Sequence, residues 1–192
     1  MCDAICPMRP ALALLLCVLA LAGCGGGGAA APASQAPSDA QAKPDGDLPR
    51  PLAALREEQN ELLQGGAEAF EARLDELEGH PVVVNKWASW CGPCRAEFPF
   101  FESQANERAG EVAFIGVNSG DYDGGAGDFL SEQPVPYPSY LDPELEVAQV
   151  FNGTAAWPTT AFYDSDGELA YVKQGGYSTE QALAEDIERY AR

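Results

Sequence analysis

Apolar residues follow two spacings from about residue 49 onward, and each spacing predicts a different element. Apolar positions recurring every three or four residues predict helices, and short apolar runs bounded by turn residues predict buried strands. The predicted helices cover 51–64, 67–78, 94–108, 125–133, 143–151 and a last segment after residue 178. The predicted strands cover 82–88, 112–119, 159–164 and 168–174.

Turn and capping residues separate several of these elements. Gly79-His80-Pro81 ends the second helix, and Ser165-Asp166-Gly167 joins the last two strands as a hairpin. Ser178-Thr179-Glu180-Gln181 is predicted to open the last helix as a capping box. Alternating strands and helices, followed by a hairpin and a helix, predict an α/β fold with a mixed central sheet and helices on both faces.

The first 48 residues lack this patterning. Residues 11–23 form an apolar stretch that is too short to span a bilayer, which needs about 20 residues. The stretch has the length of a signal-peptide core, and translation could begin at either Met1 or Met8. Residues 25–48 contain hardly any large apolar side chain, so a flexible tether is predicted there.

Leu21-Ala22-Gly23-Cys24 resembles the lipobox of bacterial lipoproteins, in which the peptide is cut before the cysteine and the sulfur receives a lipid. The resemblance implies a signal peptide over 1–23, a lipid on Cys24, a tether over 24–48 and a folded domain over 49–192. Two or more lipid chains suffice for stable anchoring, so we expect an extracytoplasmic protein on the bacterial cell membrane. The alternative is an ordinary secretory peptide.

The charge and the cysteines narrow the function classes. The chain carries 30 acidic residues against 11 lysines and arginines, a formal net charge of −19. Nucleic-acid binding needs clustered basic residues, so no nucleic-acid partner is expected. Four of the six cysteines fall within the first 24 residues, and Cys91 and Cys94 are the other two. A small disulfide-framed module would spread its cysteines through the domain, which excludes that class.

Cys91-Gly92-Pro93-Cys94 directly follows a predicted strand and opens a predicted helix. Unpaired backbone N–H groups and the positive end of the helix dipole favour a thiolate at that place, and the thiolate is the nucleophile. We therefore predict that Cys91 attacks a substrate disulfide and that Cys94, about one turn deeper, resolves the mixed disulfide.

Two other interpretations of the cysteine pair are weaker. Structural zinc needs four ligands, and beyond the pair the mature chain offers only Cys24 and His80. A purely structural disulfide across so small a loop would restrict the unfolded chain little. We expect no metal and no cofactor other than the redox-active disulfide between Cys91 and Cys94.

The segment WASWCGPCRAEFPFF, residues 87–101, resembles the active-site segment of the thioredoxin superfamily, and in particular of its extracytoplasmic TlpA/ResA-like branch. The resemblance extends over about residues 65–192 and implies a thioredoxin fold and a thiol–disulfide oxidoreductase. Pro99 stands where thioredoxins bend the active-site helix, and 157–160 resembles the family's cis-proline segment. The resemblance implies a substrate-binding surface made of Trp90, Gly92, Pro93, Trp157 and Pro158, whereas Trp87 is expected in the core.

One departure from thioredoxin concerns proton transfer. Thioredoxin has a buried Asp in the strand before its motif, and Asn85 stands at the matching position. Glu97 lies three residues after Cys94, hence on the same helix face, and a matching Glu belongs to the active site of ResA-like proteins. If Glu97 is buried, its pKa would rise and it could accept the proton of Cys94. The alternative is a solvated helical Glu.

The resemblance also implies a direction of electron flow. TlpA/ResA-like proteins reduce disulfides of exported proteins, often apocytochrome c, with electrons from a separate membrane donor. A disulfide-donating oxidase or isomerase is an alternative, since the Gly-Pro dipeptide is only one contributor to the potential. A thioredoxin-fold binding lipoprotein is an alternative of another class, but soft-metal binding would need further ligands near the pair. We expect a monomer.

Overall fold

The computed structural model describes residues 48–122 and 124–192, and every structural statement below concerns these residues. The predicted signal peptide over 1–23, and the predicted tether as far as residue 47, lie outside the described residues. Among the described helices, none is long and apolar enough to cross a membrane.

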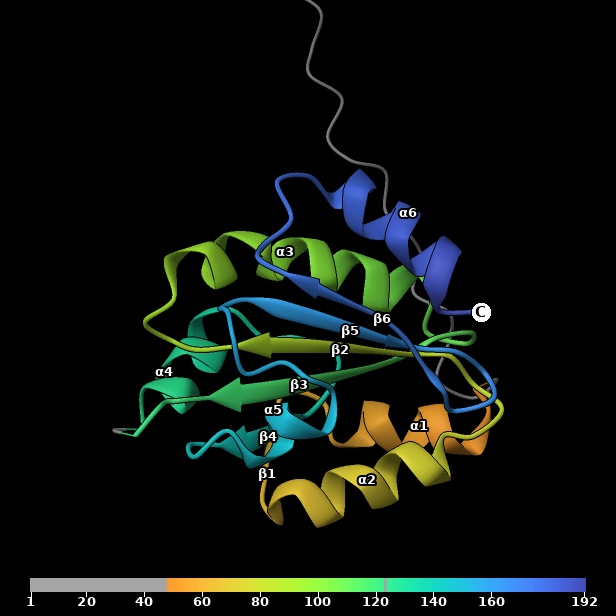
Figure 1. Ribbon diagram of the computed structural model, residues 1–192, viewed down its shortest axis with the longest axis horizontal. Coiled ribbons are helices and arrows are strands. Elements are labelled where there is room, and N and C mark those ends of the chain that lie inside the picture. Colours follow the sequence, from red (N-terminus) through yellow and green to blue (C-terminus); the bar gives the residue numbers. More distant parts are fainter. Residues whose placement is uncertain (1–47, 123) are drawn as a thin grey trace, which may run out of the picture. The chain divides into compact units, whose positions relative to one another are not determined.

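A six-stranded mixed sheet, in the order β1-β4-β3-β2-β5-β6, forms the centre of the domain (Figure 1). β2, β3, β4 and β1 run parallel, whereas β5 is antiparallel to both β2 and β6. The strands are β1 (Leu62–Leu63), β2 (Val82–Trp87), β3 (Ala113–Ser119), β4 (Ser139–Asp142), β5 (Thr159–Tyr163) and β6 (Leu169–Gln174). The predicted α/β class with a mixed sheet is confirmed.

Helices cover both faces of the sheet, each with its own apolar cluster. Side chains of α3, α4 and α6 pack in one cluster, and side chains of α1, α2 and α5 pack in the other. The helices are α1 (Arg50–Glu57), α2 (Gly66–Glu76), α3 (Gly92–Glu107), α4 (Gly125–Glu132), α5 (Glu146–Val150) and α6 (Glu180–Tyr190).

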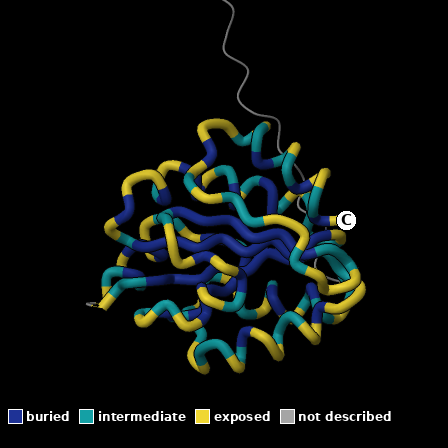
Figure 2. Tube along the Cα trace, in the orientation of Figure 1, coloured by how far each residue is buried: buried dark blue, intermediate teal, exposed yellow. Residues whose placement is uncertain are grey.

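β2 is buried along its whole length, because it lies between β3 and β5 and is covered on both faces. Alternate residues of a strand point to opposite faces. Val83 and Trp87 accordingly join the cluster under α3, and Val82 and Val84 join the cluster under α2 and α5. Figure 2 shows the central strands buried and the outer sides of the helices exposed. The core position expected for Trp87 is confirmed.

The prediction of one helix over 51–64 is wrong in its second half. α1 ends at Glu57, and Leu62–Leu63 form the edge strand β1. Asn60 adopts a left-handed conformation, φ 64°, that turns the chain out of the helix. Its side-chain amide donates to the Leu130 carbonyl and accepts from the Val135 N–H, so contacts far along the chain decide this turn.

β4 was not predicted from the sequence. β4 has only four residues, SYLD, and its pairing with β1 and β3 stabilises it as a strand.

The cap of the last helix differs from the expectation. At the start of α6, the Thr179 hydroxyl accepts from the Ala182 N–H. Alanine at that position cannot return a hydrogen bond, so the cap is one-sided rather than a reciprocal capping box.

Asp142 connects the end of β4 to the start of α5. Its carboxylate accepts from the N–H groups of Val147 and Ala148, at 2.9 and 3.0 Å, and from the Ser119 hydroxyl at 2.7 Å. The two N–H groups belong to the first turn of α5, where they have no partner within the helix. This buried side chain therefore connects the ends of β3 and β4 with the start of α5.

We expect Asp142→Ala to destabilise the domain by about 2–4 kcal/mol, because three donors to a charged acceptor lose their partner. Urea denaturation measures the free energy of unfolding directly. Glu144→Ala is the matched control: this exposed carboxylate lies two residues away, and its loss should change stability by less than about 0.5 kcal/mol. Equal effects of the two substitutions would contradict the structural role of Asp142.

Candidate active site

Cys91 and Cys94 form a disulfide at the N-terminus of α3, a short turn after the end of β2. Cys91 is the N-cap residue, with extended φ −84° and ψ 101°, and its Sγ accepts from the Cys94 N–H at 3.2 Å. Pro93 lies in the first turn, where a missing N–H leaves no hydrogen bond unmade. Cys91 keeps 4% of its surface exposed and Cys94 none, which gives the two sulfurs unequal access to solvent.

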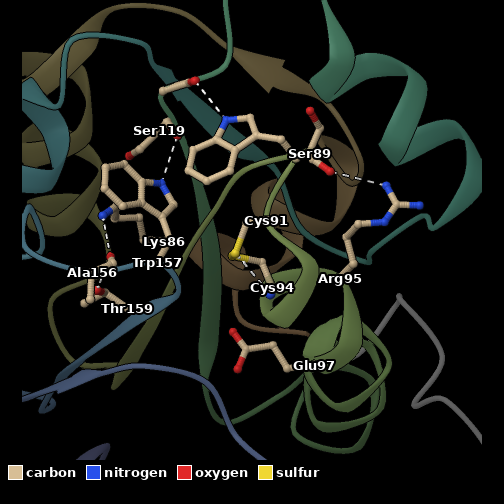
Figure 3. The surroundings of a disulfide bond; sticks show 12 residues. Lys86, Ser89, Cys91, Cys94, Arg95, Glu97, Ser119, Ala156, Trp157 and Thr159 are labelled. Atoms are coloured by element: carbon tan, nitrogen blue, oxygen red, sulfur yellow. Dashed lines mark hydrogen bonds between the residues drawn. A yellow bond between two sulfur atoms is a disulfide. The ribbon is translucent and has the colours of Figure 1, made fainter.

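The turn before Cys91 is held by a carboxylate from the next strand's end. Asp121 accepts from the Ser89 N–H and from the Ser89 hydroxyl, both at 2.7 Å, and from the Asn118 side-chain amide at 2.6 Å. The Arg95 guanidinium, one turn into α3, donates to the Ser89 carbonyl at 3.4 Å (Figure 3). This role of Asp121 was not predicted from the sequence, because no local spacing connects it with Ser89.

The cis-proline segment includes Trp157, which lies among the residues around the cysteine pair (Figure 3). The Trp157–Pro158 peptide bond is cis, as predicted, and Pro158 begins the approach to β5. Its carbonyl accepts from the Gly175 N–H at 2.9 Å, which ties the segment to the end of β6.

Trp90 and Trp157 form an aromatic pair on this surface. Their ring centres are 5.6 Å apart, and 60% of Trp90 is exposed. The indole N–H of Trp90 donates to the Gly120 carbonyl, and that of Trp157 donates to the Ser119 carbonyl (Figure 3). The structure thus brings Trp90, Gly92, Pro93, Trp157 and Pro158 to one end of the sheet, as the resemblance implied, although their contact with a substrate remains a prediction.

Glu97 is fully buried and lies on the same helix as the disulfide, one turn further on (Figure 3). Its Oε2 accepts from the Tyr177 N–H at 2.8 Å, and its Oε1 has no hydrogen-bond partner among the described residues. Burial raises the pKa of Glu97 from 4.5 to about 7, against the opposing effects of the Tyr177 hydrogen bond and Lys173. The alternative of a solvated helical Glu is thereby excluded, because Glu97 is buried.

The contacts of Gly176 show how closely Glu97 approaches the cis-proline segment. A Cβ at Gly176 would lie 3.3 Å from Glu97 Oε2 and also 3.3 Å from Pro158 Cγ. A side chain at position 176 would therefore crowd both the Glu97 carboxylate and the Pro158 ring. Asn85, the residue that replaces the thioredoxin Asp, is buried and donates at 3.5 Å to the Tyr137 hydroxyl. An amide does not titrate, so Asn85 cannot accept a proton from Cys94.

This geometry is suited to thiol–disulfide exchange. An attacking thiolate can reach the exposed part of Cys91, and the sulfur that it displaces is kept away from water at Cys94. A buried carboxyl group with a pKa near neutrality lies one turn away. The fold and this site together define a thiol–disulfide oxidoreductase of the thioredoxin fold.

Comparison with known proteins agrees with this class. The Redoxin family matches residues 39–187, and the chain belongs to that family. Thiol-disulfide oxidoreductase ResA of Halalkalibacterium halodurans is 31% identical over 72% of this chain and 78% of the relative. The thiol:disulfide interchange protein DsbE homolog of Paracoccus denitrificans is 38% identical over 53% of this chain, which spans only 55% of that relative.

A solved structure supports the fold independently. The crystal structure of a thiol:disulfide interchange protein DsbE from Chlorobium tepidum superposes with a TM-score of 0.55 at 28% identity. The superposition covers 60% of this chain and 83% of the Chlorobium tepidum chain. The sequence resemblance to TlpA/ResA-like proteins of the thioredoxin superfamily is thereby confirmed, and so is the oxidoreductase class.

The raised pKa of Glu97 predicts how stability depends on pH. Folded Glu97 keeps its proton up to a pH of about 7, whereas unfolded Glu97 loses it near the ordinary value of 4.5. The folded state binds the extra proton between these values, so the free energy of unfolding falls as the pH rises through this window. Glu97→Gln removes this dependence.

We expect the oxidised Glu97→Gln variant to match the wild type near pH 4.5 and to exceed its stability above pH 7. The excess should approach roughly 3 kcal/mol, from the linkage between pKa and stability. Urea denaturation at several pH values measures it. Glu102→Gln, which removes an exposed carboxylate from the same helix, should keep the wild-type slope. Parallel pH profiles for wild type and Glu97→Gln would show that Glu97 is not the group responsible.

Proposed function

We propose that this protein is an extracytoplasmic, lipid-anchored disulfide reductase of exported proteins in which Cys91 is the attacking thiol. The observation that carries the proposal is the asymmetry of the pair: Cys91 caps α3 and keeps 4% of its surface exposed, whereas Cys94 keeps none. The N–H of Cys94 and the dipole of α3 both favour negative charge on the Cys91 sulfur.

The reaction proceeds by two exchanges. The Cys91 thiolate attacks one sulfur of the substrate disulfide, forms a mixed disulfide and releases the other substrate sulfur as a thiolate. Cys94 then loses its proton and attacks the Cys91 sulfur. The second substrate thiol leaves, and the Cys91–Cys94 disulfide forms. The substrate gains two electrons and the protein loses two, which a membrane donor restores; we assign no further cofactor.

Glu97 is the proposed acceptor of the Cys94 proton. The carboxylate form of Glu97 accepts a proton, and its pKa of about 7 allows both protonation states at neutral pH. The unpaired Oε1 atom gives the carboxylate a free lone pair in a site shielded from water. Glu97 thereby performs the proton transfer that Asn85 cannot.

Glu97→Gln should lower the rate of mixed-disulfide resolution by about tenfold or more, the low end of general-base contributions. Stopped-flow reduction of a protein disulfide at several pH values measures this rate. The wild-type rate should rise through a pH of about 7, and the variant should lack this step. Glu102→Gln should behave as the wild type, and an unchanged pH profile in Glu97→Gln would remove Glu97 from the mechanism.

The proposed substrates are exported proteins with a disulfide, apocytochrome c among them. ResA and the DsbE homolog are named for thiol–disulfide exchange, which supports a substrate that carries a disulfide. Export and apocytochrome c follow from the resemblance to TlpA/ResA-like proteins. Trp90 and Trp157 offer an apolar surface beside Cys91, and Gly92 and Pro93 are exposed at the helix start. Trp90, Trp157, Gly92 and Pro93, together with Pro158, form the proposed substrate-binding surface.

Cys94→Ala should trap substrates on Cys91 as mixed disulfides, because the resolving thiol is lost. The trapped species are recovered from cells, released by dithiothreitol and identified by mass spectrometry. A double variant, Cys91→Ala and Cys94→Ala, should recover none of them. Apocytochrome c in the trapped set would support cytochrome maturation, and a broad set of exported proteins would point to general repair.

The redox potential tests the direction of electron flow. A value close to that of thioredoxin, about −270 mV, agrees with a reductase, whereas a value near about −120 mV would indicate an oxidase.

The proposed anchor rests on the Leu21-Ala22-Gly23-Cys24 segment, which lies outside the described residues. We expect Cys24→Ser to abolish labelling by a radioactive fatty acid and to release the protein from the membrane fraction. Cys17→Ser, inside the predicted signal peptide, should leave labelling intact. Labelling that persists in Cys24→Ser would contradict lipidation at this cysteine.

A further inference from the structure

Lys86 is a fully buried lysine on β2, on the face opposite to α3. A buried ammonium group is unfavourable unless it is hydrogen-bonded. The preceding residue on the same face of β2 is the apolar Val84. A lysine in this strand, which leads directly to the cysteine pair, must therefore have hydrogen-bond acceptors. An apolar side chain at the same position could not bind them.

The ammonium group of Lys86 binds the segment that precedes the cis-proline. Nζ donates to the Gly153 carbonyl at 2.6 Å and to the Ala156 carbonyl at 2.8 Å. The same Nζ lies 3.6 Å from the centre of the Trp157 ring, a cation–π contact (Figure 3). One side chain thus contacts the first residue of the 153–157 segment and its last two residues.

Both ends of this segment are anchored to regular structure. α5 ends in two backbone bonds, from Asn152 N–H to the Gln149 carbonyl and from Gly153 N–H to the Ala148 carbonyl. This is the Schellman pattern of a helix end, and Asn152 adopts the left-handed conformation that it requires. At the other end, Thr159 pairs with Lys86 itself across β5 and β2. The ammonium group of Lys86 therefore contacts residues 153–157, the stretch that lies between these two anchors.

The contacts continue to the substrate-binding surface. Trp157 packs between Lys86 on its inner side and the exposed Trp90 beside Cys91. Trp157 also donates its indole N–H to the Ser119 carbonyl. Loss of the ammonium group would leave the buried Gly153 carbonyl without this donor and would free the Trp157 ring on one side. The Ala156 carbonyl would keep only the Thr159 hydroxyl as its donor.

We propose that Lys86 is a positioning residue for protein substrates, which holds the 153–157 segment and Trp157 in the orientation that docks a substrate against Cys91. Lys86 touches neither sulfur of the pair in this arrangement and takes no part in the exchange chemistry. The proposal rests on thiol–disulfide exchange at Cys91 but on neither direction of electron flow.

The charge of Lys86 is set by its surroundings. Desolvation lowers the pKa of Lys86 to about 8, and Asp142, at the end of β4, opposes this decrease. Lys86 is therefore mostly protonated at neutral pH, the state that the cation–π contact with Trp157 requires.

The test compares a protein disulfide with a small one, using the full-length chain. For Lys86→Met, we expect the KM for insulin to rise by about fivefold to tenfold while kcat stays within about twofold. The second-order rate with bis(2-hydroxyethyl) disulfide, which is too small to need the docking surface, should stay within about twofold. Lys86→Arg keeps the charge and should recover at least about half of the loss in apparent affinity.

Two further variants keep the test decisive. Arg192→Met removes one positive charge at an exposed position far from the site. The Arg192 carbonyl accepts from the Ser165 N–H, beyond the far end of β5. This variant should leave the kinetic constants for both substrates unchanged. If Lys86→Met does not fold, as judged by far-UV circular dichroism, Lys86→Gln retains a neutral donor and is measured instead. It should show the same rise in KM, because the charge over Trp157 is lost.

Several outcomes would overturn the proposal: an unchanged KM for insulin in the folded variant, an equal loss on both disulfides, or no recovery in Lys86→Arg. The failure of the reductase assignment is distinguishable from these. If the wild type oxidises rather than reduces, the comparison is made between a dithiol peptide and 2-mercaptoethanol, and the peptide alone should show the raised KM in Lys86→Met.

Discussion

The antiparallel pairing of β2 with β5 is the contact on which the site depends. β2 ends at Trp87, shortly before Cys91, and β5 begins at Thr159, directly after Pro158. Because the two strands run in opposite directions, the end of one lies beside the start of the other. The register places Lys86 opposite Thr159, so the cysteine pair and the cis-proline segment meet although more than 60 residues separate them in the chain.

The same end of the sheet carries two buried ionisable groups of opposite kind. Glu97 lies on the α3 side and Lys86 on the side of α5, and burial shifts the pKa of each toward neutrality. The physical cause is the same for both, since removal from water disfavours the charged form. Their partners differ, however. Glu97 keeps one oxygen without a partner among the described residues, whereas Lys86 has two carbonyls and an aromatic ring. We connect the first arrangement with proton transfer and the second with positioning.

The surroundings of the cysteine pair are held from three separate elements. Asp121, after β3, fixes the turn at Ser89 from one side. The backbone of Tyr177, after β6, holds Glu97 from another. Asp142, at the end of β4, ties α5 and Ser119 together below Trp157. Each connection uses a short polar contact at the carboxyl end of the parallel strands or next to it. Several strand ends therefore support the site, in addition to the short cysteine loop itself.

Much of this protein could be predicted from sequence because the relevant signals are local. The apolar run of β2, the hairpin turn at 165–167 and the cysteines at the start of α3 each depend on residues that are adjacent in the chain. The cis-proline segment and Glu97 were found through resemblance and helical spacing. β1 and β4 were missed, because strands of two and four residues are stabilised by pairing with partners far away in the sequence.

The sequence by itself determined the fold class from the order of its predicted elements and the redox pair from its place at a helix start. The candidate proton acceptor followed from helical spacing together with resemblance. Only the tertiary structure decided that Asp121 supports Ser89, that Gly176 admits Glu97 close to Pro158, and that Lys86 lies beneath Trp157. The physical reason is that burial and hydrogen bonding between strand ends depend on how the sheet is assembled. Residues that look ordinary along the chain acquire a chemical role only when the sheet brings them together.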